Sequence, residues 1–380
     1  MTVLPDGGTL SDDRSVISRV LRHIDDGTTD LSAQTWREPV ANYRSAQRLS
    51  AELRVFRRQP TVFCPSAALP EPGSYLAREA AGTPLLAVRA RDGQVRVFRN
   101  ACRHRGVQVA DGAGCRTAFV CRYHGWTYGL AGELRLVPHE HGFPGLDRDL
   151  RGLTPVATVE RAGLVFVTQE QPALTDAGLD ELDRVLPAGS RLVQTTDQEI
   201  EANWKILMEG FLEGYHLRAT HRQTFYPIQF DNLNVVEEFG PHRRVAFPYK
   251  RIDRMRTAPP DEQSATGVLT YVYHLFPNVA VATFPFSTSV LVHEPLAIDR
   301  TRVNNYTLTW GDESDARWQD ALKRSLDFQL DGANEDREVA VSIQRGLASG
   351  GNEFFEFGRF EGALSHFHRT LRGALETTTR

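Results

Sequence analysis

Four side chains of types that bind metals lie in two short groups. Cys102 and His104 have one residue between them, and after sixteen further residues Cys121 and His124 follow with two residues between them. Two thiolates and two imidazoles are the ligands of a [2Fe–2S] cluster in which one iron takes both cysteines and the other takes both histidines. A Cys₂His₂ zinc site is the alternative, but zinc motifs usually have two or more residues between paired ligands. The spacing therefore favours the iron–sulfur cluster.

The imidazole ligands decide what such a cluster can do. Neutral imidazole in place of thiolate removes negative charge, so the reduction potential is higher than that of an all-cysteine cluster. The cluster can then accept electrons from a reductase and still pass them to an oxygen-activating iron. We interpret the remaining cysteines as a buried strand residue (Cys64) and a loop residue without an assigned role (Cys115). In a reducing cytoplasm we expect no disulfide framework.

A second group of metal-binding side chains follows in the next part of the chain. His216 and His221 are five residues apart and are preceded by Glu209 and Glu213. A regular α-helix would place both glutamates and His216 on one face, but it turns two side chains five residues apart to about 140° from each other. Both histidines can reach one metal only if the helix bulges or ends between them. We therefore expect a distortion near residues 217–220.

Both groups resemble motifs of one protein family. The stretches Asn100 to Gly106 and Cys121 to Tyr128 are similar to the Rieske domains of ring-hydroxylating oxygenases, and Glu201 to His221 resembles the iron-binding segment of the same family. In the family, that segment begins with a carboxylate or amide and, after three residues, has a second carboxylate. Two residues later comes a His, and four residues after it a second His. The resemblance implies that the [2Fe–2S] cluster is held by Cys102, His104, Cys121 and His124.

The resemblance also implies a mononuclear Fe(II) site. His216 and His221 need one carboxylate to complete a triad that holds Fe(II) and leaves positions open for O₂. The family has a late helix with the pattern Glu-Asp … Gln-x-Gly-Leu, which matches residues 335–347. This match indicates Asp336 as the third ligand, with Glu335 and Asp331 as alternatives.

Glu213 has a different implied role. In this family a carboxylate at this place hydrogen-bonds the iron histidine on one side and a cluster histidine of the neighbouring chain on the other. By position these are His216 and His124. The resemblance to this family also implies a homotrimer, because within one chain of the family the cluster domain lies too far from the iron. Most ring-hydroxylating members carry Asp here, whereas members that oxidise choline and carnitine carry Glu, which is a hint about the substrate.

The elements that must position these residues predict an α+β protein. Short alternating runs with turn signals, such as Asp92-Gly93, predict an all-β Rieske domain over 58–168. It is expected to pack on a catalytic iron domain over 169–380, for which the resemblance implies a helix-grip arrangement of antiparallel sheet and long helices. Residues 1–57 are predicted to form an N-terminal helical segment that packs on the catalytic domain.

Apolar periodicity predicts the helices of these regions. In the N-terminal segment we expect helices over 14–24 and 41–57. In the catalytic domain we expect one helix over 203–223, which carries the two histidines, and another over 315–348, which carries Asp336.

The implied activity is that of a terminal oxygenase that hydroxylates or demethylates a small organic or aromatic molecule with O₂. Its electrons must come from a separate NAD(P)H-dependent reductase, directly or through a ferredoxin, since the chain has no dinucleotide fingerprint and no plant-type ferredoxin cysteine run. The alternatives are the alpha subunit of a dioxygenase that cis-dihydroxylates aromatic rings and a Rieske electron carrier without oxygenase activity. The presence of both histidines and Asp336 argues against the carrier.

Aromatic residues near the iron motif are candidates for the substrate pocket. They suit a flat ring or a cation held against ring faces, although each can equally be an ordinary core residue. These residues are Phe225, Tyr226, Phe230, Phe284 and Phe286.

Composition limits the partners and the location. The chain has 380 residues and a net charge of −4, which gives no reason to expect nucleic acid or an anionic membrane as a partner. No apolar run approaches the roughly 20 residues of a membrane helix. Residues 1–10 lack a basic start followed by an apolar stretch, so we expect no signal peptide and a cytoplasmic enzyme.

Overall fold

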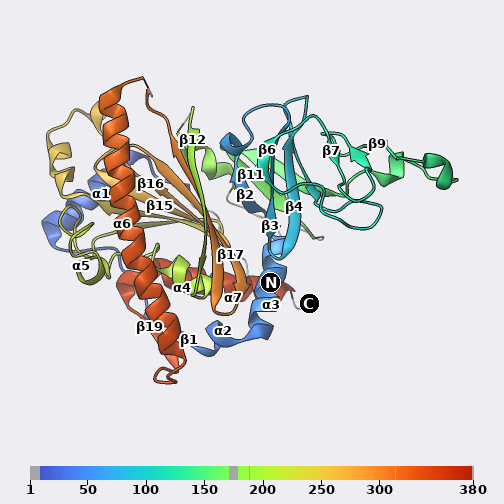
Figure 1. Ribbon diagram of the computed structural model, residues 1–380. Helices are drawn as coiled ribbons and strands as arrows, with labels where there is room; N and C mark the ends of the chain where they lie inside the picture. The colour runs from blue at the N-terminus through green and yellow to red at the C-terminus, as the bar shows by residue number, and fades with distance from the viewer. Residues whose placement is uncertain (1–8, 171–178, 188, 313, 379–380) are drawn as a thin grey trace. The chain divides into compact units, whose positions relative to one another are not determined.

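The computed structural model describes residues 9–170, 179–187, 189–312 and 314–378 (Figure 1). These residues form two compact units. One unit is continuous and comes from Phe56–Leu174, and the other combines Met1–Val55 with Thr175–Arg380. The part of the chain before Phe56 therefore belongs to the same unit as the C-terminal half of the chain.

The continuous unit consists of antiparallel strands. Its described residues form a seven-stranded sheet, β2-β11-β10-β5-β4-β3-β6, and a three-stranded sheet, β7-β8-β9. The predicted hairpin at Asp92-Gly93 is confirmed, because β4 pairs antiparallel with β5 and Gly93 has a φ of 80°, which glycine adopts without strain. The prediction of a loop at Cys115 is wrong, since this residue ends β6 and pairs with Ser74. The strands are β2 Thr61–Pro65, β3 Ser74–Ala80, β4 Thr83–Arg89, β5 Val95–Arg99, β6 Gly112–Cys115, β7 Phe119–Val120, β8 Thr127–Tyr128, β9 Leu134–Leu136, β10 Pro155–Arg161 and β11 Leu164–Thr168.

The larger unit is built on a second antiparallel sheet. Its described strands follow the order β12-β18-β17-β16-β15-β14-β13, so strands β13 to β18 are each next to their neighbour in sequence and β12 pairs with the last of them. Figure 1 shows the long helix α6 lying across this sheet. The combination agrees with the predicted α+β class. The strands are β12 Arg191–Ile200, β13 Val235–Phe239, β14 His242–Pro248, β15 Leu269–Leu275, β16 Val279–Thr283, β17 Thr288–Ala297 and β18 Arg300–Thr309, with a separate ribbon of β1 Trp36–Pro39 and β19 Phe354–Phe357.

Two of the predicted helices are confirmed. The helix expected over 315–348 is α6, Ala316–Leu347, whose N-cap Asp315 accepts a hydrogen bond from Arg317 N at 2.9 Å. The helix expected over 14–24 is α1, Asp13–Asp26. Of the helices that the structure describes, none is long and apolar enough to cross a membrane. The remaining helices are α2 Ala41–Arg44, α3 Ala46–Arg58, α4 Trp204–Glu209, α5 Leu217–Thr220 and α7 Gly362–Thr378.

The other two predicted helices are interrupted. The segment expected as one helix over 41–57 is α2 and α3, separated at Ser45, whose ψ of 119° is extended. The segment expected as one helix over 203–223 contains α4 and α5 with a non-helical turn between them. Apolar spacing continues through both breaks, so periodicity alone could not locate them.

Candidate cluster and iron sites

The predicted cluster residues lie on two loops with the same backbone hydrogen bonds. The amide of each cysteine, Cys102 and Cys121, donates to the carbonyl five residues later, and the amide four residues later donates back to the cysteine carbonyl, all at 2.8 to 2.9 Å. The returning donors are Gly106 and Gly125, with φ of 78° and 71°. A side chain at either position would be strained. Two matching turns therefore present the predicted ligands.

The structure places the thiols inside the unit and the imidazoles toward its surface. Cys102 and Cys121 are free thiols, only 4% and 3% exposed, in the apolar core. His104 is half-buried and His124 is exposed, with their ring centroids 4.7 Å apart. Trp126 stacks on His104 at 5.0 Å. Two buried thiols and two neighbouring imidazoles, presented by matching turns, are the donor set that a Rieske [2Fe–2S] cluster would take.

Tyr128 contacts the cluster site through its hydroxyl group. The oxygen lies 3.3 Å from Cys102 Sγ and accepts a hydrogen bond from Arg103 N at 2.9 Å. Burial and the hydrogen bond with Cys102 raise the pKa of Tyr128, so the hydroxyl keeps its proton. A cysteine that binds a metal is a thiolate and can only accept, so the hydroxyl would donate to the sulfur when the cluster is bound. Hydrogen bonds to ligand sulfurs are among the features that set the potential of such clusters.

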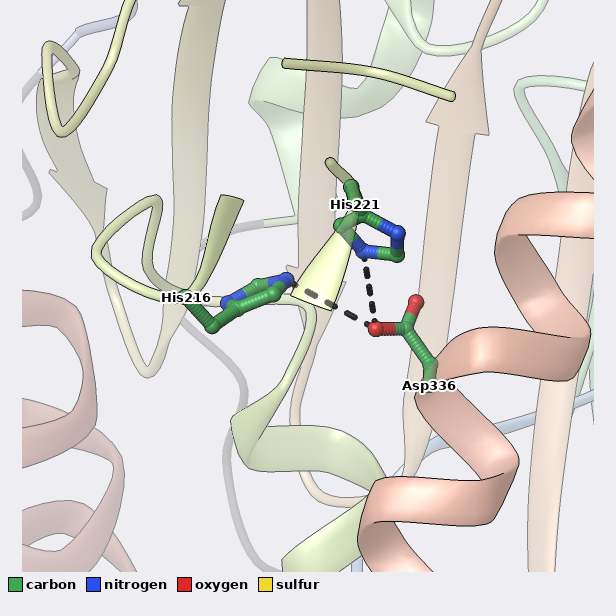
Figure 2. A group of neighbouring side chains, drawn as sticks. All are labelled: His216, His221 and Asp336. Atoms are coloured by element: carbon green, nitrogen blue, oxygen red, sulfur yellow. Dashed lines mark ion pairs between the residues drawn. The ribbon is translucent and has the colours of Figure 1, made fainter. Parts of the chain in front are cut away.

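The three predicted iron ligands converge on one point (Figure 2). One ligand atom each from His216, His221 and Asp336 lies within 4.8 Å of the other two. Asp336 Oδ1 is 2.9 Å from His221 Nε2 and 3.6 Å from His216 Nε2. Two imidazole nitrogens and one carboxylate oxygen that meet in this way are the donor set of a facial triad, so the site fits Fe(II).

A carboxylate holds the other nitrogen of each imidazole. His216 Nδ1 lies 2.5 Å from Glu213 Oε1, and His221 Nδ1 lies 2.7 Å from Glu335 Oε2. Glu335 also accepts a hydrogen bond from Thr224 Oγ1 at 2.6 Å. Such contacts fix the tautomer and the ring orientation of metal-binding histidines, and they leave Nε2 free for the metal.

The same contacts separate Asp336 from its alternatives. Glu335 binds Nδ1 of His221, on the far side of the ring from the triad. Asp331 is exposed and is not part of the described three-residue group. Asp336 faces Nε2 of both histidines, so the geometry favours it as the third ligand.

The helix break near the two histidines lies at a different place from the one expected. Residues 217–220, where we expected a distortion, form the regular turn α5, with His216 as its N-cap and His221 as its C-cap. The break comes earlier, after Glu209, which ends α4. Glu213 therefore does not share a helix face with Glu209 and His216; it lies in the turn and accepts a hydrogen bond from His216 N at 3.1 Å. A single helical turn with one histidine at each end brings both rings to one site.

Carboxylates dominate the electrostatics around His216. Burial lowers the pKa of His216, but the hydrogen bond and charge of Glu213, with the charges of Asp336 and Glu361, outweigh burial and leave this pKa above its ordinary value. Burial raises the pKa of Glu361 to about 7, and the charges of Glu213 and Glu209 add to the rise. The resulting negative potential favours a divalent cation at the triad.

One of the predicted pocket aromatics contacts the triad. Phe225 packs edge-on against His221, with the ring centroids 4.8 Å apart. Among the ring contacts of the described residues, none joins the other four to the triad. These four are half-buried: Tyr226, Phe230, Phe284 and Phe286.

Three contacts of these sites were not anticipated from the sequence. They are the hydrogen bonds of Glu335 and Thr224 around His221 and the approach of Tyr128 to Cys102. Thr224 lies three residues after His221, close enough in sequence to have been considered. The hydrogen bond of Glu335 has no local signal in the sequence, because Glu335 lies 114 residues after His221.

Comparison with known proteins relates both units to one family. The family model described as ring hydroxylating alpha subunit (catalytic domain) matches residues 187–377, and that of the Rieske [2Fe-2S] domain matches residues 59–156. The chain belongs to the ring-hydroxylating alpha subunit family of Rieske oxygenases.

Individual relatives span most of the chain. Choline monooxygenase from Spinacia oleracea is 25% identical over 358 residues, which cover 89% of this chain and 78% of the relative. The carnitine monooxygenase oxygenase subunit of Escherichia coli (strain K12) is 26% identical over 364 residues, 89% of this chain and 93% of the relative. A crystal structure of the quaternary ammonium Rieske monooxygenase CntA shares the fold, with a TM-score of 0.77 at 19% identity over 97% of this chain and 99% of that one.

Family membership establishes the class of reaction. The chain is a terminal oxygenase that uses O₂ and electrons from a separate reductase to oxidise a small molecule, with a Rieske [2Fe–2S] cluster and non-haem iron as cofactors. The zinc alternative and the electron-carrier alternative are not supported, because both the Rieske model and the catalytic-domain model match.

Proposed function

We propose that this oxygenase adds one oxygen atom to a small quaternary amine at an iron held by His216, His221 and Asp336. The observation that carries the site is the convergence of one ligand atom from each of these residues within 4.8 Å. Two facts support the substrate class. Two relatives are named as a choline monooxygenase and a carnitine monooxygenase. Position 213 is Glu, as in family members that oxidise those compounds.

The residues of the chain have distinct roles in this proposal. When bound, the cluster supplies electrons one at a time and the iron binds and activates O₂ beside the substrate. Glu213 and Glu335 orient the two imidazoles through Nδ1, and Phe225 provides an apolar surface next to His221. The cluster ligands are Cys102, His104, Cys121 and His124.

We also propose that Glu213 connects the two centres between neighbouring copies of a homotrimer. Its carboxylate holds His216 through both Nδ1 and the backbone amide. His124 is exposed, as a cluster ligand must be if another copy is to reach it. Sedimentation equilibrium tests the assembly, and the expected mass is three times that of the 42.6 kDa chain. A monomer or dimer at working concentration would contradict the proposal.

The reaction is tested by a single turnover without the reductase. Purified protein loaded with iron and cluster is reduced chemically and exposed to O₂ with one of two substrate pools. The first pool contains choline, L-carnitine and glycine betaine, and the second contains benzoate, terephthalate and naphthalene. Mass spectrometry with ¹⁸O₂ follows the products.

Each outcome has a clear meaning. One labelled oxygen atom in a quaternary amine, or loss of a methyl group as formaldehyde, supports the proposal. Two labelled atoms on a ring would instead identify a ring-dihydroxylating dioxygenase. A ratio of about three irons per two sulfides is expected in the loaded protein, whereas two irons per two sulfides would mean that the triad holds no iron.

A further inference from the structure

A glycine lies in the middle of the long helix α6, four residues before the predicted iron ligand Asp336. Gly332 is buried, and glycine within a helix is less favourable than alanine because it loses more backbone freedom on folding. The other glycine of α6, Gly346, is exposed near the C-terminal end of the helix. A buried glycine at position 332 therefore needs an explanation from its surroundings.

The ring of Phe225 takes the space that a side chain at position 332 would occupy. A Cβ atom built on Gly332 would lie 2.3 Å from Phe225 Cε2, 2.8 Å from Cζ and 3.2 Å from Cδ2. Carbon atoms that are not bonded prefer separations of about 3.5–4.0 Å, so no larger residue fits here unless the ring moves. The glycine therefore lets the Phe225 ring lie directly against α6.

Other contacts hold this ring on two further sides. It lies nearly perpendicular to His221, with the centroids 4.8 Å apart, and perpendicular to Phe328, with the centroids 5.1 Å apart. Phe328 comes four residues before Gly332, on the same face of α6. The Phe225 backbone is held as well, because its carbonyl accepts hydrogen bonds from the amides three and four residues later, at 3.0 and 2.9 Å. A displaced ring must therefore give up one of these contacts.

The histidine beside this ring is enclosed by groups that orient it. His221 Nδ1 lies 2.7 Å from Glu335 Oε2, and its Nε2 lies 2.9 Å from Asp336 Oδ1 (Figure 2). The residue is only 1% exposed. Groups behind a metal-binding imidazole fix the orientation of its ring. Phe225 is therefore the apolar part of the support that directs Nε2 to the metal.

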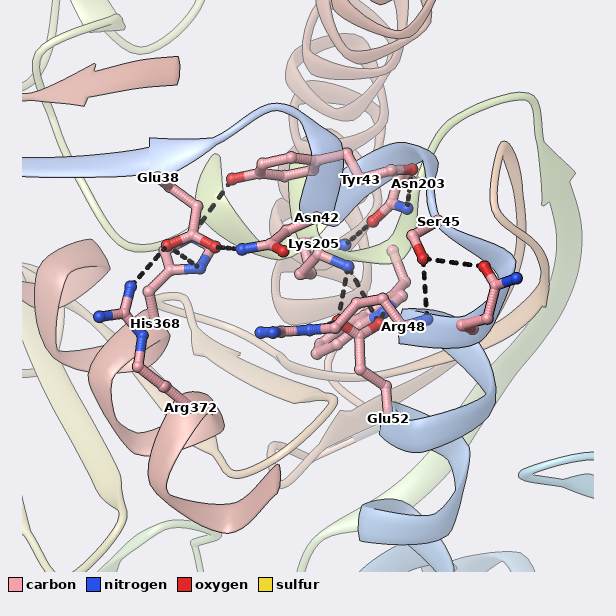
Figure 3. A network of polar contacts seen from close by, with 12 residues as sticks. Glu38, Asn42, Tyr43, Ser45, Arg48, Glu52, Asn203, Lys205, His368 and Arg372 are labelled. Carbon is pink, nitrogen blue, oxygen red and sulfur yellow. Dashed lines mark hydrogen bonds and ion pairs between the residues drawn. The ribbon is translucent and has the colours of Figure 1, made fainter. Parts of the chain in front are cut away.

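The other end of the iron-binding segment is held by buried polar contacts. In α4 the Lys205 ammonium contacts both carboxylate oxygens of Glu52, at 2.9 and 3.0 Å (Figure 3). Glu209, which ends α4, accepts a hydrogen bond from the Tyr43 hydroxyl at 2.6 Å and lies 2.8 Å from His368 Nε2. A change confined to the packing of the aromatic ring can therefore disturb one triad ligand and leave these polar contacts in place.

We propose that Gly332 is a positioning residue of the iron site, because it gives Phe225 the room to support His221 and to form an apolar wall beside the substrate. A side chain at position 332 pushes the ring away from α6 and toward the imidazole, since Phe328 closes another side. His221 then holds the metal less well, and the ring enters the space beside the iron. This inference rests on the proposed function, since it takes the triad as the iron site.

Three variants and one control test this arrangement. They are Gly332→Ala, Phe225→Leu, the combination of both, and the control Gly346→Ala. Leucine lacks Cε2 and Cζ, the two ring atoms nearest to the Cβ position, so the combination relieves the overlap. Gly346→Ala makes the same substitution on the same helix at a place where no atom lies within 4 Å of the new Cβ. Far-UV circular dichroism checks the fold of each variant.

The affinity for iron is measured by competition with a chelator. Gly332→Ala should bind iron about 10-fold more weakly, within the range for a metal ligand that loses its support. In the Phe225→Leu background the same substitution should change the affinity by less than about twofold, because the two effects are coupled through one contact. Gly346→Ala should match wild type. No loss in Gly332→Ala, or an equal loss in both backgrounds, would overturn the proposal.

Nitric oxide reports the geometry of the ferrous site without substrate. The EPR signal of the nitric oxide complex is recorded with the cluster oxidised, when the cluster itself gives no signal. Gly332→Ala should change the shape of this signal, and the combination should give the same signal as Phe225→Leu alone. An unchanged signal in Gly332→Ala would overturn the proposal. If Gly332→Ala does not fold, Phe225→Leu should restore the fold, and failure to do so would also overturn it.

The substrate provides the last measurement. For the compound that the wild-type protein oxidises in the pooled assay, KM should rise about 10-fold in Gly332→Ala, which is the scale of a methylene misplaced in an apolar pocket. It should return toward the Phe225→Leu value in the combination, and an unchanged KM in Gly332→Ala would contradict the role of the ring as a wall. A wild-type protein that binds only two irons per two sulfides would instead refute the proposed function.

Discussion

Tyr128→Phe should lower the reduction potential of the cluster. The substitution removes the hydroxyl that lies 3.3 Å from Cys102 Sγ and leaves the ring in the apolar core. A hydrogen bond to the sulfur stabilises the reduced cluster more, because the reduced form carries one more negative charge. If this difference is about 1–2 kcal/mol, the one-electron potential falls by about 40–90 mV, since a tenfold change in equilibrium constant corresponds to about 59 mV.

The assay is a redox titration followed by the visible absorption and EPR signal of the cluster. Tyr75→Phe is the matched control, because Tyr75 belongs to the same core but its hydroxyl donates to Asp111 O at 3.3 Å, away from the cluster ligands. The control should leave the potential within about 10 mV of wild type, which is well below the predicted change. An equal shift in both variants, or no shift in Tyr128→Phe, would refute the assigned role of the hydroxyl.

Four further outcomes are expected. Asp336→Ala should lower the iron-to-sulfide ratio from about 3:2 to about 2:2 and leave the visible spectrum of the cluster unchanged; a retained third iron would exclude Asp336 as a ligand. Glu335→Gln should weaken iron binding about 10- to 100-fold in a chelator competition, because Glu335 holds His221 Nδ1 at 2.7 Å; wild-type affinity would mean that this contact does not matter. Glu213→Gln should retain both metal centres and lose most reductase-driven turnover, and full activity would contradict the bridge. Burial lowers the pKa of His293 from 6.5 to about 4, so the unfolded chain binds a proton that the folded chain does not. The stability that comes from this difference is fully present above pH 6.5 and is about 2 kcal/mol lower at pH 5. The free energy of unfolding in urea should therefore depend less on pH for His293→Gln than for wild type. An equal dependence would refute the role given to His293.

The sequence alone predicted the features that depend on residues close together along the chain. Cys102 and His104 are nearly adjacent, so their spacing alone indicates a shared metal site. Helix α6 was predicted to within one residue at each end, because its apolar residues recur every three or four positions and Asp315 is a good N-cap. Membership of the family then followed from the same motifs.

Local patterns failed between Glu209 and His221. The apolar spacing there is compatible with one helix, but the chain leaves the helix after Glu209 and resumes it for one turn. In the turn between the two helices, the Glu213 carboxylate accepts a hydrogen bond from the His216 amide. A side chain therefore takes the place of a backbone carbonyl of the helix. Tertiary contacts routinely override helix propensity in this way.

The amino-acid sequence by itself determined which side chains are candidates for binding the metals, because ligand chemistry belongs to residue types and their spacing. Only the tertiary structure decided where the adjacent Glu335 and Asp336 lie: they point about 100° apart on a helix and therefore meet opposite sides of His221. It also brought Glu38, Glu209 and His368 together from three distant parts of the chain. No local pattern links such residues, since their proximity depends on how the helices pack.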